Sequence, residues 1–186
     1  RQQEFAAYAG LGLLPGRVVG EHRSHYRVAT EAAEVTAEAG GRVRGAAKER
    51  SDMPGVGDFV AVRSAQGDGP VMIEGVLPRT TALVRKASGE QRPQLLAANI
   101  DVAFILTAAD GDFNIARIER YLALVRESGA DPVIVLNKSD LAHDVIGPTS
   151  QIAGIAPGVP VHIISARASD SIGEIVRYFD GNRTIV

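Results

Sequence analysis

From Ala97 onward the sequence alternates between apolar runs of strand length and amphipathic segments of helix length. The apolar runs are Ile100–Thr107, Val133–Leu136 and Val161–Ile164. The segment Asn114–Ser128 spaces its apolar residues as one face of a helix that Gly129 is placed to end. A second such segment passes through Ile172, Ile175, Val176 and Phe179. Strands that alternate with helices form right-handed βαβ units, so this half is predicted to be an α/β domain with a parallel sheet.

The residues before Ala97 have a different pattern, in which short β-like runs are separated by turns rich in glycine and proline. Alternation typical of a strand is visible in Tyr26, Val28 and Thr30. The runs are Arg17–His22, His25–Thr30, Glu34–Ala39, Asp58–Arg63 and Val71–Leu77. Five short strands of this kind predict a small β-barrel, closed or nearly closed, for which an OB-fold is the leading candidate. Gln2–Ala9 has the pattern of a short amphipathic helix.

This organisation predicts four segments along the chain. They are an N-terminal helical segment (1–14), an OB-fold domain (15–78), a basic linker (79–98) and the α/β domain (99–186). The chain begins at Arg1 rather than at a methionine, and its last residues, Thr184–Val186, read like the start of a strand. We therefore expect the sequence to be part of a longer protein.

Composition excludes several classes of protein. Hydrophobic residues make up 45% and charged residues 23% of the chain, and the longest apolar runs have strand length, so no membrane span is predicted. The absence of cysteine excludes disulfides and thiolate metal sites in this chain, and the four histidines lack metal-ligand spacing. The net charge is +2 over residues 1–92 and −4 over 93–186. A solvated surface is the default explanation of this mild asymmetry, which only weakly favours nucleic acid as a partner of the first half.

The tetrapeptide Asn137-Lys138-Ser139-Asp140 directly follows the apolar run Pro132–Leu136. Ligands of open α/β sheets bind beyond the carboxyl ends of the strands, where these four residues fall. The Asp140 carboxylate could accept two parallel hydrogen bonds from guanine N1–H and N2–H₂, and the aliphatic stem of Lys138 could lie over a purine face. Adenine lacks both donors and would leave the acid unpaired. The alternative is a polar turn that caps a helix.

A second motif, Ser165-Ala166, ends the next apolar run and is predicted to reach the same sheet edge. A small residue there allows the backbone N–H of Ala166 to approach guanine O6, and we expect Asn137 to tether the neighbouring loops. The two motifs in this register favour guanine binding over helix capping. No phosphate loop of the form G-x-x-x-x-G-K-[ST] occurs, so a base site is predicted without a phosphate site. Asp52–Gly55 fits the loose D-x-x-G pattern but precedes a barrel strand, so we interpret it as a turn.

The order of these parts resembles the circularly permuted, ribosome small-subunit-dependent GTPases (the ribosome small-subunit-dependent GTPase A family). The resemblance covers nearly the whole chain, and its most specific blocks are Ala98–Asp101 and Asn137–Asp140. The matching blocks in full are Gly16–Val19, Pro54–Asp58, Leu77–Arg79, Leu95–Asp101, Ile118–Leu122, Val135–Leu141 and Ile164–Ala166.

The resemblance implies an N-terminal OB-fold, a permuted GTPase domain and a C-terminal zinc-binding domain, with the phosphate loop and switch regions after Val186. It implies a cytoplasmic, monomeric GTPase that binds GTP or GDP, acts late in assembly of the small (30S) ribosomal subunit and contacts its rRNA through the OB-fold. The ligands of Mg²⁺ and of a structural Zn²⁺ are then expected outside this sequence. For want of a phosphate cradle, we expect these residues alone not to hydrolyse GTP.

Basic residues of the barrel and the linker are candidates for RNA contact, because OB-folds bind nucleic acid through one sheet face and its loops. The candidates are Arg17, Arg23, Tyr26, Arg27, Arg42, Arg44, Arg79, Arg85 and Lys86. The alternative is a scatter of solvated arginines among glutamates such as Glu21, Glu31 and Glu34.

Two other functions stay open at this point. One is an RNA-binding module with a vestigial nucleotide site and no catalysis. The other is a permuted GTPase that acts on a different RNA or protein partner. A phosphate loop after Val186 would favour a GTPase over the module.

Overall fold

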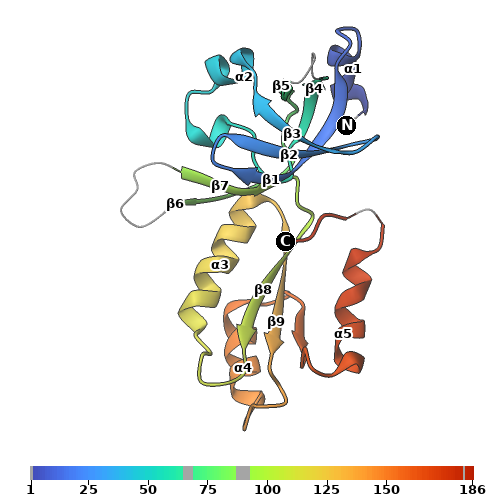
Figure 1. Cartoon of the computed structure of the whole chain (residues 1–186). Coiled ribbons are helices and arrows are strands. Elements are labelled where there is room, and N and C mark those ends of the chain that lie inside the picture. The colour runs from blue at the N-terminus through green and yellow to red at the C-terminus, as the bar shows by residue number, and fades with distance from the viewer. Residues whose placement is uncertain (1, 65–68, 87–92, 182) are drawn as a thin grey trace. The chain divides into compact units, whose positions relative to one another are not determined.

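The computed structural model describes residues 2–64, 69–86, 93–181 and 183–186. The chain divides into two compact units, Arg1–Asn99 and Ile100–Val186 (Figure 1). Each unit is described by itself. None of the helices in the described ranges combines the length and the apolar character that crossing a membrane requires.

The first unit contains a closed five-stranded barrel with the strand order β1-β2-β3-β5-β4. Its elements are α1 (Gln2–Ala9), β1 (Leu14–His22), β2 (His25–Thr30), β3 (Glu34–Ala39), α2 (Gly41–Ala46), η1 (Arg50–Asp52), β4 (Phe59–Arg63) and β5 (Val71–Val76). The pairing of β3 with β5 is parallel, and the other barrel pairings are antiparallel. This arrangement confirms the predicted OB-type barrel.

Alternating strand residues fill the barrel interior. Val18, Val28, Val60, Val62 and Ile73 are all almost completely buried and pack in one cluster. The strand β1 begins at Leu14 rather than at the predicted Arg17, because Leu14 to Arg17 pair with β4 before the chain continues along β2. One strand thus belongs to both sides of the closure, as a closed barrel requires.

Two further strands form an antiparallel pair within the first unit, in the segment expected to join the two parts. They are β6 (Ala82–Lys86) and β7 (Pro93–Ala98). The pair is held against the loop before β4, because the Ala98 N–H donates to the Val56 carbonyl oxygen at 2.8 Å. The described residues of 79–98 are therefore largely β-structure.

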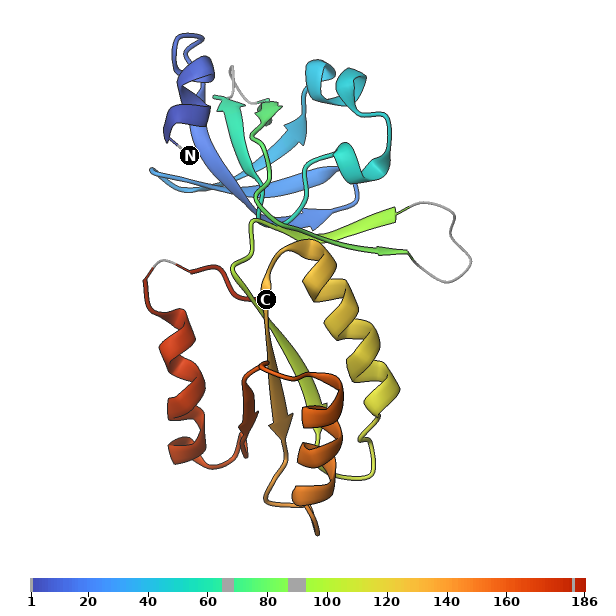
Figure 2. The same ribbon diagram turned by 180° about the vertical axis from the view of Figure 1, so that it is seen from behind.

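The second unit has a three-stranded parallel sheet in the order β10-β9-β8. Its elements are β8 (Val102–Ala108), α3 (Ile115–Ser128), β9 (Asp131–Asn137), α4 (Ile146–Ile155), β10 (Val161–Ile163), α5 (Ser169–Val176) and η2 (Arg177–Phe179). Helices α3 and α4 lie side by side on one face of the sheet and α5 lies on the other (Figures 1 and 2). These elements confirm the predicted α/β arrangement.

Local sequence explains where α3 starts and stops. The Asn114 side chain accepts a hydrogen bond from the Arg117 N–H at 2.9 Å, which caps the first turn. Gly129 ends the helix in the left-handed region, with φ of 84°. On the β8 edge opposite β9, Val102 and Ile185 form a parallel bridge.

Candidate functional site

The register of the parallel sheet brings the predicted motifs to one edge. Ala108 at the end of β8 is paired with Asn137 at the end of β9, and Leu136 of β9 is paired with Ile163 of β10. The loops that follow the three strands therefore start at the same level. This is the edge at which open α/β sheets bind their ligands.

Asn137 joins two of these loops. Its side-chain Oδ1 accepts from the Lys138 N–H at 2.8 Å and from the Ala166 N–H at 3.0 Å. The Ser139 N–H donates in turn to the Ile164 carbonyl oxygen at 3.1 Å. The predicted tethering role of Asn137 is confirmed. The Ala166 N–H, expected to face guanine O6, donates here to Asn137, so a guanine would have to share that hydrogen or displace the amide oxygen.

The backbone of Lys138 is in the left-handed region, with φ of 63°. Residues other than glycine seldom adopt this conformation. Its ammonium group contacts the Asp110 carboxylate, with 2.8 Å between Nζ and Oδ2. The hydrogen bond from Lys138 lowers the pKa of Asp110, and the same bond raises the pKa of Lys138. Both groups are thus charged near neutral pH.

Asp140 is the most accessible acceptor of the predicted motif. The residue is exposed, and its carboxylate forms no hydrogen bond or ion pair within the part of the chain that the structure describes. The capping alternative is not what the structure contains, because helix α4 begins only at Ile146. Asp144 supplies the acceptor there, for the N–H groups of Ile146 and Gly147 at 2.8 Å and 3.1 Å. The Asp140 carboxylate remains available to a ligand.

Ser165 anchors the loop after β10, and Ala166 is an exposed residue of that loop. Ser165 is buried, and the Ser171 hydroxyl of α5 bonds to both its N–H and its carbonyl oxygen, at 3.0 Å and 2.8 Å. Ala166 is exposed at the sheet edge. Helix α5 therefore holds the loop through Ser165, while the small side chain of Ala166 is exposed.

A cavity of about 370 Å³ opens beside this motif. Its volume is within the range of small-molecule sites. It contains both apolar and charged groups, and it includes Thr107, whose buried hydroxyl has no hydrogen-bond partner among the described residues. The lining residues are Leu106, Thr107, Ala108, Asp112, Arg117, Tyr121, Asn137 and Lys138.

Sequence reasoning missed Asp110. The residue lies two positions after β8, and the paired ends of β8 and β9 bring it to Lys138. An acidic residue just beyond a predicted strand was the available signal, but its partner depends on a strand register that the sequence alone does not provide.

Two of the predicted RNA-binding residues have structural roles instead. Tyr26 is 4% exposed and packs in the barrel core, so it cannot stack on a base at the surface. Arg79 is engaged by the buried carboxylate of Asp58 and by the carbonyl oxygens of Ser51 and Met53. Neither belongs to an exposed basic surface.

The other candidates differ in their exposure and in their contacts with the rest of the barrel. Arg17 lies over the Phe59 ring, 5.0 Å from its centroid, and the Arg44 Nε donates to the Ala39 carbonyl oxygen at 2.7 Å. The exposed candidates are Arg23, Arg27, Arg42, Arg44 and Arg85, of which Arg27 pairs with Glu34 at 3.2 Å. The side chain of Lys86 lies outside the described residues.

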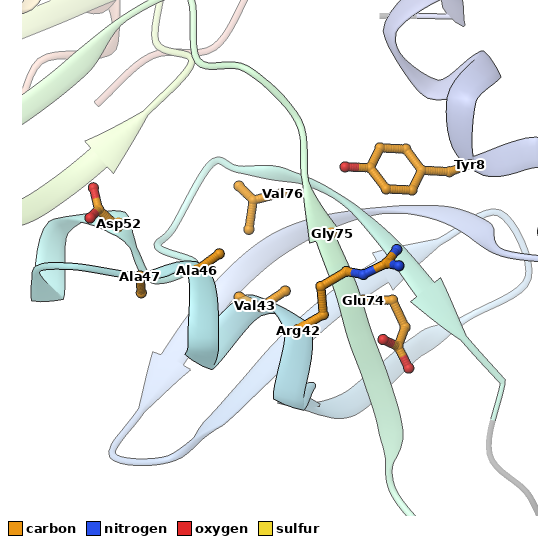
Figure 3. A pocket seen from close by; sticks show the side chains of 9 residues that line it. All are labelled: Tyr8, Arg42, Val43, Ala46, Ala47, Asp52, Glu74, Gly75 and Val76. Carbon is orange, nitrogen blue, oxygen red and sulfur yellow. The ribbon is translucent and has the colours of Figure 1, made fainter.

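Arg42 stands at a second cavity, of about 300 Å³, in the first unit (Figure 3). Figure 3 shows that α1 contributes Tyr8, α2 contributes Arg42 and Val43, and β5 contributes Glu74. Asp52 also lines it. The cavity is therefore a feature of the barrel and its helices.

Asp52, the first residue of the D-x-x-G match, is held by local backbone hydrogen bonds at the end of a short helix. Its carboxylate accepts from the N–H groups of Lys48 and Glu49, at 2.9 Å and 3.0 Å, and it ends the short helix η1. These two backbone hydrogen bonds lower the pKa of Asp52.

Comparison with known proteins gives a consistent result. The RsgA GTPase family model matches residues 76–186. The chain is 37% identical, over its whole length, to the small ribosomal subunit biogenesis GTPase RsgA of Syntrophotalea carbinolica. It is 40% identical over 97% of its length to the protein of that name from Opitutus terrae. It spans about half the length of these curated relatives, 52% in both cases.

Two solved structures share the fold. The circularly permuted GTPase YloQ superimposes with a TM-score of 0.63 at 23% identity, over 93% of this chain and 58% of that one. YjeQ from Thermotoga maritima gives 0.67 at 24% identity, over 91% of this chain and 58% of that one. The barrel and the parallel sheet thus have the architecture of the matching part of these two proteins.

Proposed function

This chain belongs to the RsgA GTPase family, and from that premise we propose that the loops after β8, β9 and β10 bind the guanine base of GTP or GDP. The intact protein then acts as a GTPase in biogenesis of the small ribosomal subunit, the role that its relatives' names give to those proteins. We further propose that it is cytoplasmic and monomeric. One observation carries the proposal: Asp140 presents an exposed carboxylate, without a partner among the described residues, next to the hydrogen-bonded loops of Asn137 and Ala166.

The chemistry of these groups suits guanine. The two carboxylate oxygens of Asp140 accept from N1–H and N2–H₂, a charge-assisted bidentate arrangement. The aliphatic stem of Lys138 covers one face of the base, and the Asn137 amide with Ala166 borders the O6 edge. Adenine has neither donor, so it would desolvate Asp140 without pairing it.

Hydrolysis needs groups beyond these. Phosphoryl transfer depends on a phosphate cradle and on Mg²⁺ ligands, and the sequence contains no phosphate-loop motif. The described ranges contain no group of three or more His, Asp or Glu residues that could hold a metal ion. We propose that the ligands of Mg²⁺ and of a structural Zn²⁺ lie on residues outside this sequence. A purified chain of these 186 residues should not turn over GTP, and measurable turnover would contradict this.

The direct test measures GDP and ADP binding by calorimetry, using the protein at its full natural length. We expect GDP to bind and ADP not to bind, and Asp140→Ala to abolish the difference. Asp131→Ala is the matched control, because Asp131 is an exposed aspartate at the opposite end of the same strand. Equal affinity for both nucleotides in the unmodified protein would remove the basis for a guanine switch and leave an RNA-binding module as the function.

We also propose that the barrel contacts ribosomal RNA through its exposed arginines. Arg23 lies in the turn between β1 and β2, Arg27 on β2 and Arg42 on α2, and all three are exposed. Phosphate contacts from such residues are strong, sequence-independent and salt-dependent. The domain expected at 15–78 supplies this surface, and the domain expected at 99–186 supplies the base site.

Charge reversal separates the two activities. The double substitution Arg23→Glu, Arg27→Glu should weaken binding to purified small ribosomal subunits and leave GDP affinity unchanged. Arg63→Glu is the control, because Arg63 is an exposed arginine of the same barrel on strand β4. If the double variant bound subunits as well as the control did, the RNA contact would have to be sought on another surface.

A further inference from the structure

The ion pair between Lys138 and Asp110 links the loops that follow two adjacent strands. The residues lie 28 positions apart, and the distance between Nζ and Oδ2 is 2.8 Å. The lysine follows β9 and the aspartate follows β8. The contact therefore joins the two loops at the sheet edge where the base site is proposed.

The aspartate end of this contact is held in place. Asp110 Oδ1 accepts from the Asp112 N–H at 3.1 Å. Arg117 Nη2 of α3 donates to the carbonyl oxygen of Asp112 at 2.6 Å and to Asp112 Oδ2 at 3.0 Å. The Ala109 N–H donates to the Asn137 carbonyl oxygen at 2.8 Å. The loop with Asp110 is thus attached both to helix α3 and to strand β9.

The lysine end is held at its backbone. The Lys138 N–H donates to Asn137 Oδ1, and the Lys138 carbonyl oxygen accepts from the Leu141 N–H at 3.0 Å. With the backbone fixed on one side and the ammonium on the other, the four methylenes between them have a defined course. The side chain is still 49% exposed, so a ligand can reach it.

A fixed lysine stem has an energetic consequence for binding. A free lysine loses much of its rotamer freedom when a ligand packs against it. Where the side chain is already ordered, that cost is met before the ligand arrives, and affinity rises through pre-organisation. The charge states support this, because the pair lowers the pKa of Asp110 and raises that of Lys138, which keeps both groups ionised at neutral pH.

We propose that Asp110 is a positioning residue for nucleotide binding: it holds the Lys138 side chain along the base site, so that its stem is pre-formed as a platform for the purine face. This inference rests on the proposed guanine site. Asp110 does not contact the base. It acts through Lys138, and it therefore contributes to affinity for purine nucleotides without choosing among them. That choice belongs to Asp140.

The test compares GDP with inosine diphosphate (IDP), which lacks the exocyclic amino group, on the protein at its full natural length. Asp110→Asn removes the charge and nearly preserves the shape of the side chain. Since exposed ion pairs are weak, we expect GDP and IDP affinities to fall together, by about two- to fivefold, with their ratio unchanged. Asp131→Asn is the matched control, because it neutralises an exposed aspartate at the opposite end of β9 from Lys138.

A double-mutant cycle shows whether the effect acts through the lysine. Lys138→Met keeps an apolar stem and removes the ammonium, so Asp110→Asn should have no further effect in that background. The inference is overturned if Asp110→Asn matches the Asp131→Asn control, tightens GDP binding, or has its full effect in the Lys138→Met protein. Its failure is distinct from failure of the guanine site itself, in which Asp140→Ala would leave GDP affinity and the GDP-to-IDP ratio unchanged.

Discussion

Arg79 holds the buried carboxylate of Asp58 through two hydrogen bonds, from Nε to Oδ1 at 2.8 Å and from NH2 to Oδ2 at 2.7 Å. The same guanidinium donates to the carbonyl oxygens of Ser51 and Met53, and Asp58 also accepts from the Gly55 N–H at 2.9 Å. The pair thereby ties the segment leading into β6 to the loop between η1 and β4. A buried charge of this kind is tolerated only because it is fully paired.

Removing Arg79 should therefore be costly. Arg79→Met leaves the Asp58 carboxylate, 0% exposed, without its counter-charge, and such a loss typically costs about 3–5 kcal/mol. Hydrogen exchange of buried barrel amides, for example those of Val60 and Ile73, would measure the change in unfolding free energy. Arg63→Met is the control, because its pair with Glu74 is solvent-exposed and should be worth about 1 kcal/mol or less. Equal effects of the two substitutions would contradict the structural role of Arg79.

Gly57 allows the barrel loop to approach strand β7. Its φ of 94° is strained for any residue with a side chain, and an added Cβ would collide with the Ala98 carbonyl oxygen. Gly57→Ala should destabilise the first unit by about 1–3 kcal/mol from backbone strain, with the collision in addition. Gly41→Ala is the comparison, since a Cβ there meets no atom within 4 Å. Urea unfolding, monitored through hydrogen exchange of the same barrel amides, measures the stability of both variants. Equal stability of the Gly57→Ala and Gly41→Ala proteins would refute the proposed role of Gly57.

The barrel shows which features of the fold were predictable. The period-two pattern of β2 identified the strand, and the same pattern places Tyr26 beside Val28 on the buried face. The assignment of Tyr26 to RNA binding ignored that consequence. Arg79 could not have been placed, because its partner is 21 residues away in a loop whose conformation the sequence does not specify. Composition had suggested a basic linker where the described residues form strands and a buried ion pair.

The second unit shows the same division between local and non-local information. Gly129 was predicted to end α3 and does so, whereas Asn114, predicted as the first helical residue, instead caps a helix that begins at Ile115. Helix α4 was not predicted, because Gly147, Pro148 and Gly154 are helix breakers; the proline is tolerated in the first turn, where its missing N–H has no helical partner. The contact of Asp110 with Lys138 depends on the pairing of two strands and became visible only with the structure.

Asp140→Asn should change which base is preferred rather than abolish binding. An amide keeps one acceptor oxygen for guanine N1–H but turns its NH₂ group toward the guanine amino group, so two donors face each other. Xanthine carries a carbonyl oxygen at that position, which accepts from the amide. Affinity for GDP should fall by about tenfold or more and affinity for xanthosine diphosphate should rise, because each unpaired polar group costs about 1–3 kcal/mol. Calorimetry with both nucleotides measures this, and a parallel loss of both would indicate that residue 140 supports the loop rather than reads the base.

The pair of Asp110 and Lys138 predicts a characteristic pH dependence. Because the pKa of Asp110 is lowered on folding, its stabilising contribution is present above the usual aspartate pKa and is lost as pH falls through the lowered value. Because the pKa of Lys138 is raised, its contribution is complete below the usual lysine pKa and is lost as pH rises through the raised value. The pair should thus persist across the whole neutral range. NMR titration of the Asp110 carboxyl carbon should give a pKa below the usual aspartate range, and Lys138→Met should move it upward, since the lysine is the main cause of the shift. An Asp110 pKa that does not respond to Lys138→Met would show that the two side chains are not paired in solution.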